Sequence, residues 1–132
     1  MWTHIAPLSE DELVKFETTF SFRLNPALHQ FILTHNAAKS HQATVPSLCK
    51  ERKVSAILDF AEGGNAWETN RRMRKVLGTR CIVIAIDRFE NYICISRVYS
   101  NQQVTIWNHV TGELEECTLD LLELLDIWNG NT

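Results

Sequence analysis

Four short apolar runs follow one another between residues 81 and 118, and they constrain the fold more than any other feature of the chain. They cover residues 81–86, 92–99, 103–109 and 114–118. The segments between them contain the Asp, Asn and Gly residues that favour tight turns. Turns this short can join antiparallel neighbours, whereas parallel strands need a long crossover. The pattern therefore predicts an antiparallel meander of four strands.

The segments before and after this meander carry helix-capping residues and helical periodicity. Ser9 and Glu12 have the spacing of a capping box, in which each side chain accepts a hydrogen bond from the backbone N–H of the other residue. Asn25 followed by Pro26 predicts an N-cap and a proline at the first position of a second helix. Leucines at helical spacing predict an amphipathic C-terminal helix over residues 119–128.

The middle of the chain predicts one more helix and one more strand. Asn65 is the expected N-cap of a helix that ends at Gly78. Residues 54–60 predict a strand, and residues 36–46, which are polar and aperiodic, predict a loop. Together these elements predict an α+β fold in which helices pack on a mainly antiparallel sheet. We expect a single domain over residues 1–132, with its core from about residue 8 to residue 128.

The charge balance restricts the class of partner. The 132 residues include 13 Lys and Arg against 16 Asp and Glu, for a formal net charge of -3. Dedicated nucleic-acid-binding domains are usually basic, so the balance argues against nucleic acid. No apolar run approaches the ~20 residues of a membrane helix, and the N-terminus lacks the features of a signal peptide. The expected location is the cytoplasm.

Cysteine spacing argues against a zinc site and a disulfide. The cysteines are Cys49, Cys81, Cys94 and Cys117. No two have C-x-x-C spacing, and no His stands near them at zinc-finger spacing. If Tyr92 faces Ile86 in the predicted hairpin, Cys94 lies opposite Ile84 and Cys81 points to the other face. That register forbids a bridge between Cys81 and Cys94, and we expect free thiols in a reducing compartment.

No catalytic motif is recognisable in the chain. Hydrolase, zinc-protease, P-loop, dinucleotide-binding and EF-hand signatures are all missing from the sequence. His35 and His41 bracket the polar loop, but two His without a third ligand do not make a metal site. The turn that holds Asp87, Glu90 and Asn91 offers too few oxygen ligands for calcium. The residues therefore predict a binding module rather than an enzyme, with no cofactor and no metal.

Two segments carry charge of one sign. The basic one contains Arg71, Arg72, Arg74 and Lys75 without an interleaved aromatic residue, and a solvated helix face is its preferred interpretation. Residues 113–126 carry six carboxylates and no Lys or Arg. A solvated face is the preferred interpretation of this acidic segment too. The segment nevertheless gives the molecule an acidic end that opposes the basic patch. Trp107 is either a partly buried core residue or an interface anchor.

Four segments, in their order along the chain, resemble the SUKH superfamily, whose best-known members are bacterial immunity proteins. Residues 12–17 resemble its opening helix, and residues 24–32 resemble its leucine–proline element followed by an amphipathic helix. The sequence Ile-Ala-Ile-Asp at 84–87, continued by 91–94, resembles its characteristic hairpin. Residues 103–109 and 119–125 resemble the strand with a Trp-Asp-His-like end and the closing helix. The resemblance extends from about Leu8 to Trp128 and implies a sheet packed by helices.

The sequence departs from the family pattern in two motifs. Ala37 and Ala38 replace the glycines of a helix-ending Asn-Gly-Gly, and Glu90 replaces the glycine of the hairpin. Because glycine reaches positive φ without steric cost, both losses predict changed loop geometry. The resemblance implies no cofactor and no catalytic residue.

The leading hypothesis is an immunity protein that binds and neutralises a cognate polymorphic toxin. Many toxins guarded by this family are nucleases, whose clefts are basic, so carboxylates are the expected contacts. The candidate contact residues are Asp87, Glu90, Trp107, Glu113, Glu115 and Glu116. One alternative is a regulatory protein-interaction scaffold of the same fold without a toxin partner. Another is an enzyme or nucleic-acid-binding protein that uses the basic segment.

Overall fold

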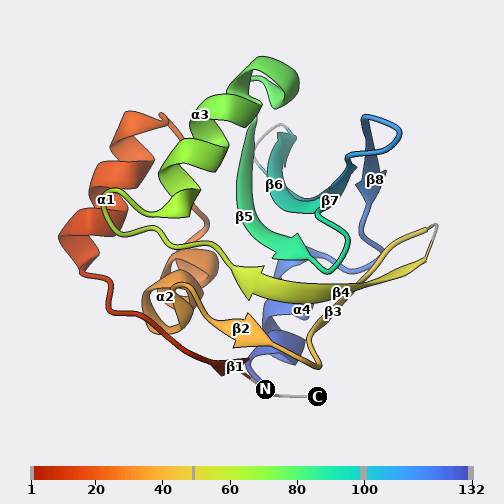
Figure 1. The fold of residues 1–132 in the computed structure, drawn as a ribbon, viewed down its shortest axis with the longest axis horizontal. Helices are drawn as coiled ribbons and strands as arrows, with labels where there is room; N and C mark the ends of the chain where they lie inside the picture. The colour runs from red at the N-terminus through yellow and green to blue at the C-terminus, as the bar shows by residue number, and fades with distance from the viewer. Residues whose placement is uncertain (1, 49, 99–100, 131–132) are drawn as a thin grey trace.

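The computed structural model describes residues 2–48, 50–98 and 101–130. Its helices are α1 (Glu10–Thr19), α2 (Pro26–His35), α3 (Asn65–Leu77) and α4 (Leu121–Trp128). Its strands are β1 (Trp2–Thr3), β2 (Lys39–Ser40), β3 (Thr44–Pro46), β4 (Glu51–Ile57), β5 (Cys81–Asp87), β6 (Tyr92–Val98), β7 (Asn101–Asn108) and β8 (Glu113–Glu116). Figure 1 shows α1 and α3 beside each other, with β5 to β8 curling away from them.

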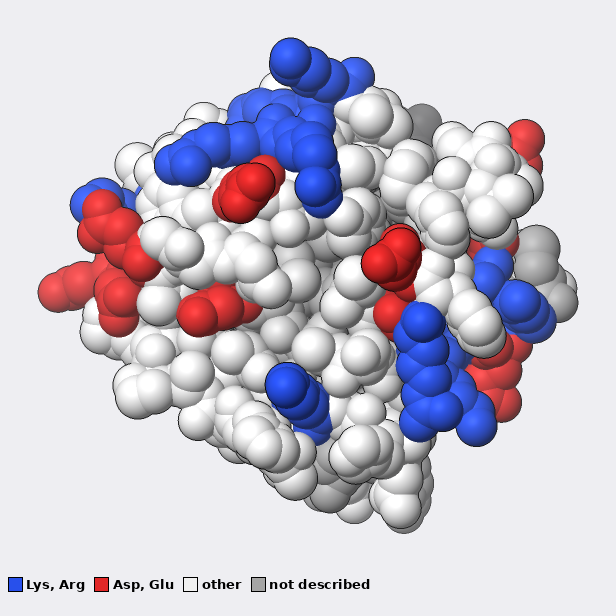
Figure 2. Space-filling model, in the orientation of Figure 1, with Lys and Arg blue, Asp and Glu red and all other residues white. Residues whose placement is uncertain are grey.

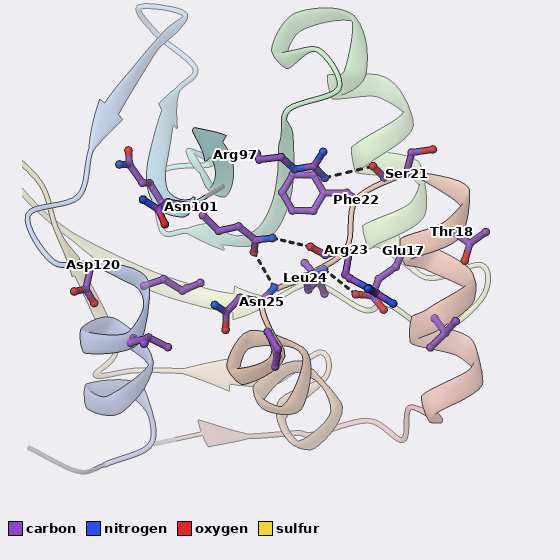
Figure 3. A pocket seen from close by; sticks show the side chains of 16 residues that line it. Glu17, Thr18, Ser21, Phe22, Arg23, Leu24, Asn25, Arg97, Asn101 and Asp120 are labelled. Carbon is purple, nitrogen blue, oxygen red and sulfur yellow. Dashed lines mark hydrogen bonds between the residues drawn. The ribbon is translucent and has the colours of Figure 1, made fainter. Parts of the chain in front are cut away.

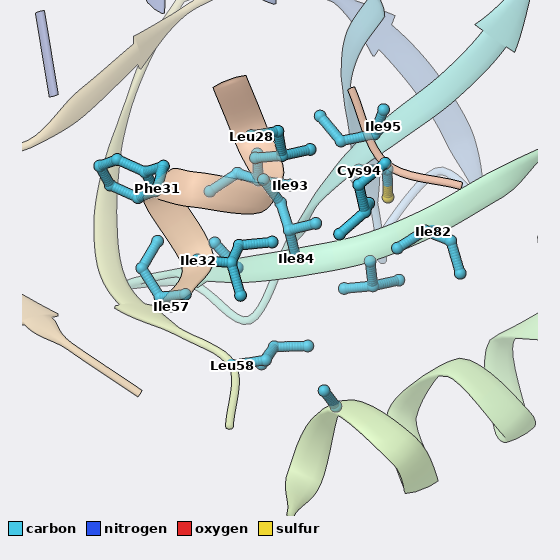
Figure 4. Packing of buried hydrophobic residues seen from close by; sticks show 14 of the residues in the cluster. Leu28, Phe31, Ile32, Ile57, Leu58, Ile82, Ile84, Ile93, Cys94 and Ile95 are labelled. Carbon is cyan, nitrogen blue, oxygen red and sulfur yellow. The ribbon is translucent and has the colours of Figure 1, made fainter. Parts of the chain in front are cut away.

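All strand pairs are antiparallel, so the predicted α+β class with a mainly antiparallel sheet is confirmed. The order is β1-β2-β4-β5-β6-β7-β8, and β3 pairs with β4 off this path. Neighbours β5 to β8 form the predicted meander, and Tyr92 faces Ile86 as expected. The strand alternation turns Ile93 and Ile95 to the face that α2 covers, where they meet Leu28 and Ile32 (Figure 4).

The predicted caps of α1 and α2 are confirmed. Ser9 Oγ accepts the backbone N–H of Glu12 at 3.1 Å, and Glu12 Oε1 accepts the backbone N–H of Ser9 at 3.1 Å. Asn25 Oδ1 accepts the backbone N–H of Ala27 at 2.9 Å, and Pro26 is the first residue of α2. These local bonds satisfy N–H groups that have no partner inside the helix.

The N-cap of α3 is Gly64, so the expectation of an Asn65 cap is wrong. Asn65 is the first helical residue, and its Oδ1 accepts the backbone N–H of Asp59 at 2.6 Å. Residues 59–64 fold back so tightly that a Cβ on Gly64 would lie 2.4 Å from the Asp59 carbonyl oxygen. Only glycine fits there, which explains why the cap position moves by one residue.

The segment predicted as a loop, residues 36–46, contains β2 and β3. Both strands pair with β4, and β4 begins at Glu51, three residues before the predicted start of the strand. Strands of two or three residues are too short to show an alternation of their own. Their pairing with a distant strand, rather than their local pattern, determines them.

A β-bulge overturns the predicted register of the cysteines. Tyr92 pairs with Ile86, but the register shifts between Val83 and Ala85, so Cys94 faces Val83 instead of Ile84. The extra residue turns Cys81 and Cys94 to the same face of the sheet. Both thiols are free, as is that of Cys117, while Cys49 lies outside the described residues. Burial and the neighbouring Cys81 raise the pKa of the Cys94 thiol.

A buried asparagine completes β5 where β4 ends. Just past the end of β4, the Leu58 N–H donates a backbone hydrogen bond to the Ile84 carbonyl of β5. Beyond it, Asn70 of α3 accepts the Val83 N–H at 2.8 Å and donates to the Val83 carbonyl at 3.0 Å. Its amide also donates to the Ala66 carbonyl. One side chain therefore replaces a missing strand and attaches α3 to the sheet.

Two of the residues that stand in place of the family's glycines have a left-handed backbone. Ala37 has φ 60° and Glu90 has φ 66°. Both residues adopt the backbone region that glycine favours, so replacement of the glycine has not removed positive φ at these positions. A residue with a Cβ is strained there by roughly 1–2 kcal/mol, and the surrounding contacts hold it in place.

Candidate functional site

Three turns meet at one end of the sheet and enclose a cleft of about 740 Å³. We call it the loop-end cleft. The β3–β4 hairpin contributes Lys50 and Arg52, and the β5–β6 turn contributes Phe89 and Asn91. The end of β7, the β7–β8 turn and β8 contribute residues 108–111, Glu113 and Glu115. Two sets of polar contacts hold the three turns against one another.

A buried ion pair joins the β3–β4 hairpin to β8. Arg52 Nη2 donates to Glu115 Oε1 at 2.8 Å and to Oε2 at 2.6 Å, and Arg52 Nε donates to Oε1 at 3.2 Å. The side chains are only 5% and 11% exposed. Asn108 Nδ2 and Ser47 Oγ donate to the same carboxylate. Five donated hydrogen bonds thus surround one carboxylate, which is the arrangement that a buried charge requires.

A chain of side-chain bonds joins the β5–β6 turn to the β7–β8 turn. Asp87 Oδ1 accepts the backbone N–H groups of Phe89 and Asn91 at 2.8 and 2.9 Å, and its Oδ2 accepts Asn91 Nδ2 at 3.0 Å. Asn91 Oδ1 in turn accepts the backbone N–H of His109 at 3.1 Å and lies 2.9 Å from its ring Nδ1. The turns at this end of the sheet are therefore mutually braced.

The structure separates the six predicted contact residues. Asp87 is 3% exposed and its carboxylate shapes its own turn, so it offers no surface for direct contact. Glu113 and Glu115 belong to the loop-end cleft, and Glu90 is exposed on the adjoining turn. Trp107 and Glu116 point to the opposite face, because Ile106 pairs with Glu115 and Trp107 with Leu114.

The surface around the cleft carries both signs of charge. Exposed Glu90 and Glu113 lie in the same region as exposed Lys50, Lys53 and Arg88. Figure 2 shows blue and red side chains next to each other on the side of the β3–β4 hairpin. The acidic run at 113–116 is thus not a surface of one sign, because the hairpin brings basic side chains beside it.

Residues that the sequence did not single out supply the apolar part of the cleft. Phe89 is 69% exposed and Val110 is 80% exposed, and both line it. The Lys50 Nζ lies 5.8 Å from the centroid of the Phe89 ring. The sequence feature that could have identified Phe89 and Val110 is a large apolar residue within an otherwise polar turn, because the turn conformation itself does not require one.

The Arg52–Glu115 pair predicts a loss of stability in acid. Burial raises the pKa of the Glu115 carboxyl, but hydrogen bonds from Arg52 and Asn108 and the charge of Arg52 outweigh it, so the pKa lies below 4.5. A lowered pKa in the folded protein means that the unfolded chain takes up the proton first. The stabilisation is therefore complete above pH 4.5 and disappears as the pH falls through the folded-state pKa.

Urea unfolding from pH 7 to pH 3 (about four pH units, ample for one carboxyl) measures this effect. The pKa of Glu12 is lowered too, mainly by the hydrogen bond from the Ser9 backbone N–H, so this carboxyl also contributes to the pH dependence. Comparison with Glu115→Gln isolates the pair, because the variant should show the shallower decline of unfolding free energy. Parallel curves for both proteins would show that the pair contributes nothing to the pH dependence.

A larger groove of about 1010 Å³ lies between α1 and α4 and contains none of the six predicted residues. Figure 3 shows how its polar groups bind one another. Gln102 donates to the Arg23 carbonyl at 2.6 Å and accepts the backbone N–H of Asn25 at 2.8 Å. Arg97 stacks over Phe22 at 4.5 Å. These bonds hold the connection between α1 and α2 against the β6–β7 hairpin, which is a structural role.

The described residues contain no cluster of metal ligands and no long apolar helix. No group of three or more His, Cys, Asp or Glu in this part of the chain could hold a metal ion. His35, one of the two His considered for a metal, stacks on Phe31 with ring centroids 4.2 Å apart. No helix among the described residues is long and apolar enough to cross a membrane.

Comparison with known proteins identifies the family. A search of curated proteins finds no match. The model of the SMI1 / KNR4 family (SUKH-1) matches residues 7–127, which is nearly the whole chain. The match includes α1, α2, α3, each strand from β2 to β8, and α4 except for its last residue, Trp128. The chain belongs to the SMI1 / KNR4 (SUKH-1) family.

Proposed function

We propose that the chain is a non-catalytic protein-binding module, an immunity protein that binds and neutralises a cognate bacterial toxin in the cytoplasm. Residues 1–132 would act as one domain. Membership of the SUKH-1 family supports a role of this type. The observation that carries the proposal is the loop-end cleft, whose braced turns expose Phe89 and Val110.

The two apolar side chains are the proposed anchors of the complex. Large exposed apolar groups beside polar rims are typical of protein-contact surfaces, and a few such anchors carry most of the binding energy. The turns that hold them are tied together by Glu115 and Asn91, so little ordering entropy is lost on binding. The cleft is therefore pre-organised for a partner.

The charged rim would select the partner and its orientation. Glu90 and Glu113 are exposed near the anchors and would face basic groups, such as those of a nuclease cleft. Lys50 and Arg88 on the same rim would face carboxylates. A rim of both signs favours one docking orientation, because any other orientation places like charges together.

The test measures binding to the polypeptide encoded beside this gene, together with protection of cells that express it. The double variant Phe89→Ser/Val110→Ser should bind roughly 10–100-fold more weakly than the wild type, because each lost anchor removes more than 1 kcal/mol. It should also fail to protect. The control is Leu122→Ser, which removes a side chain that is 58% exposed on α4 and not part of the cleft.

Two results would contradict the proposal. One is equal binding by the wild type and the double variant while the Leu122→Ser control weakens it. The other is a neighbouring polypeptide that is not toxic, which would favour the regulatory scaffold.

A further inference from the structure

The exposed side of α3 carries a basic patch that the loop-end cleft does not use. Its members are Arg71, Arg72, Arg74 and Lys75, with Arg80 in the turn that follows. None of the five is in an ion pair within residues 2–48, 50–98 and 101–130. Figure 2 shows them as a blue band over α3. Their charge is therefore available to a partner.

Three of the arginines are held over aromatic rings instead of extending freely into water. The guanidinium of Arg71 lies 5.6 Å from the Trp67 ring centroid. Arg72 lies 6.0 Å from the Tyr92 ring and donates to the Tyr92 hydroxyl. A third, Arg74, lies 5.8 Å from the Phe20 ring. Such contacts fix long side chains before binding, so less entropy is lost when an anion arrives.

The patch continues into an apolar row on the sheet. Tyr92, Trp107 and Leu114 face one another on β6, β7 and β8. The Tyr92 and Trp107 rings are stacked with centroids 5.8 Å apart, and Leu114 is 45% exposed. Because Arg72 binds Tyr92, the basic patch and the row form one continuous surface. We call it the α3–row surface.

We propose that the α3–row surface binds an acidic polypeptide segment that also carries apolar side chains. Carboxylates of the segment would lie on the α3 cations, and its apolar side chains would lie on Trp107 and Leu114. This surface is separate from the loop-end cleft, because Trp107 and Glu115 point to opposite faces of the sheet. The proposal does not depend on the partner of the cleft being a toxin.

The observations favour a polypeptide over a nucleic acid. Tyr92 already contacts Arg72 through its hydroxyl and Trp107 through its ring, so less of its ring remains for a base. Carboxylates adjoin the blue band in Figure 2, and the chain carries a net charge of -3. A long polyanion would meet these carboxylates, whereas a short acidic segment fits between them.

The test uses fluorescence anisotropy with a short labelled peptide of Glu and Leu. Wild-type protein should bind it, with an affinity that falls as salt is raised. Arg71→Glu/Lys75→Glu should bind at least about 10-fold more weakly, since like charges replace two attractive ones. The matched control, Arg23→Glu/Lys39→Glu, makes the same change of net charge at two exposed residues outside both the basic patch and the loop-end cleft, and it should bind like the wild type. Leu114→Ser should weaken binding of the Glu–Leu peptide but not of a Glu–Ser peptide.

Several results would overturn the proposal. A Lys–Leu peptide that binds as well as the Glu–Leu peptide would show that charge is not recognised. Equal losses in the two charge-swap variants would show that net charge alone matters. An oligothymidine that binds more tightly than the peptide in the same salt would assign the patch to nucleic acid. If the double variant does not fold, the single variant Lys75→Glu takes its place, because the Lys75 side chain makes no hydrogen bond, ion pair or ring contact within the described residues.

Discussion

Replacing Glu115 with alanine is expected to lower the free energy of unfolding by about 3–5 kcal/mol. The substitution leaves the Arg52 guanidinium buried without a counter-charge, since that side chain is only 5% exposed. It also removes the acceptor of Asn108 Nδ2, so the β7–β8 turn loses a connection to the β3–β4 hairpin. Urea unfolding followed by circular dichroism measures the change.

Two further variants separate the effect of the unpaired buried charge from the effect of losing a side chain on β8. Glu113→Ala removes an exposed carboxylate of the same strand and should change stability by less than about 0.5 kcal/mol. The apolar pair Arg52→Met/Glu115→Leu should recover most of the loss, because it leaves no buried charge unpaired. A Glu115→Ala protein within 1 kcal/mol of the wild type (about a fivefold change in the unfolding equilibrium) would mean that water reaches the guanidinium.

Replacing Asn70 with alanine is expected to cost about 2–6 kcal/mol, because two buried backbone groups each lose a partner worth about 1–3 kcal/mol. Those groups are the N–H and the carbonyl of Val83, which Asn70 alone satisfies on the side where β4 has ended. Hydrogen exchange should report the change locally, with the Val83 amide losing protection first.

The comparison for Asn70→Ala is Glu68→Ala, an exposed substitution on the same helix. It should leave both stability and the exchange of the Val83 amide near wild-type values. Similar effects of the two substitutions would show that Asn70 contributes only helix propensity and that β5 does not depend on it.

Both substitutions also bear on function. Glu115 holds two of the three turns of the loop-end cleft together, so Glu115→Ala should misplace Val110 on the β7–β8 turn as well as destabilise the fold. Asn70 instead attaches α3, and with it the basic patch, to the sheet. The α3–row surface therefore depends on Asn70, whereas the loop-end cleft depends on Glu115.

Local patterns were enough to predict the elements whose partners are near in the chain. The capping box at Ser9 and Glu12, the Asn25–Pro26 start of α2 and the meander from β5 to β8 all form as expected. Each depends on contacts between residues a few positions apart or across a short turn. The sequence also places Glu113 and Glu115 after the last turn of the meander, which is where the structure has them.

The remaining features depend on contacts between distant parts of the chain, which no local pattern contains. Arg52 and Glu115 are 63 positions apart, so the sequence could not show that a presumed surface carboxylate is buried in an ion pair. The bulge at Val83 shifts the register by one residue and turns Cys81 to the face of Cys94. The amino-acid sequence by itself determined the helices α1 to α4 and the strands β4 to β8, but not the short strands β1 to β3. Only the tertiary structure decided which charges are paired and which remain for a partner, because burial and pairing depend on what the folded chain places beside each group.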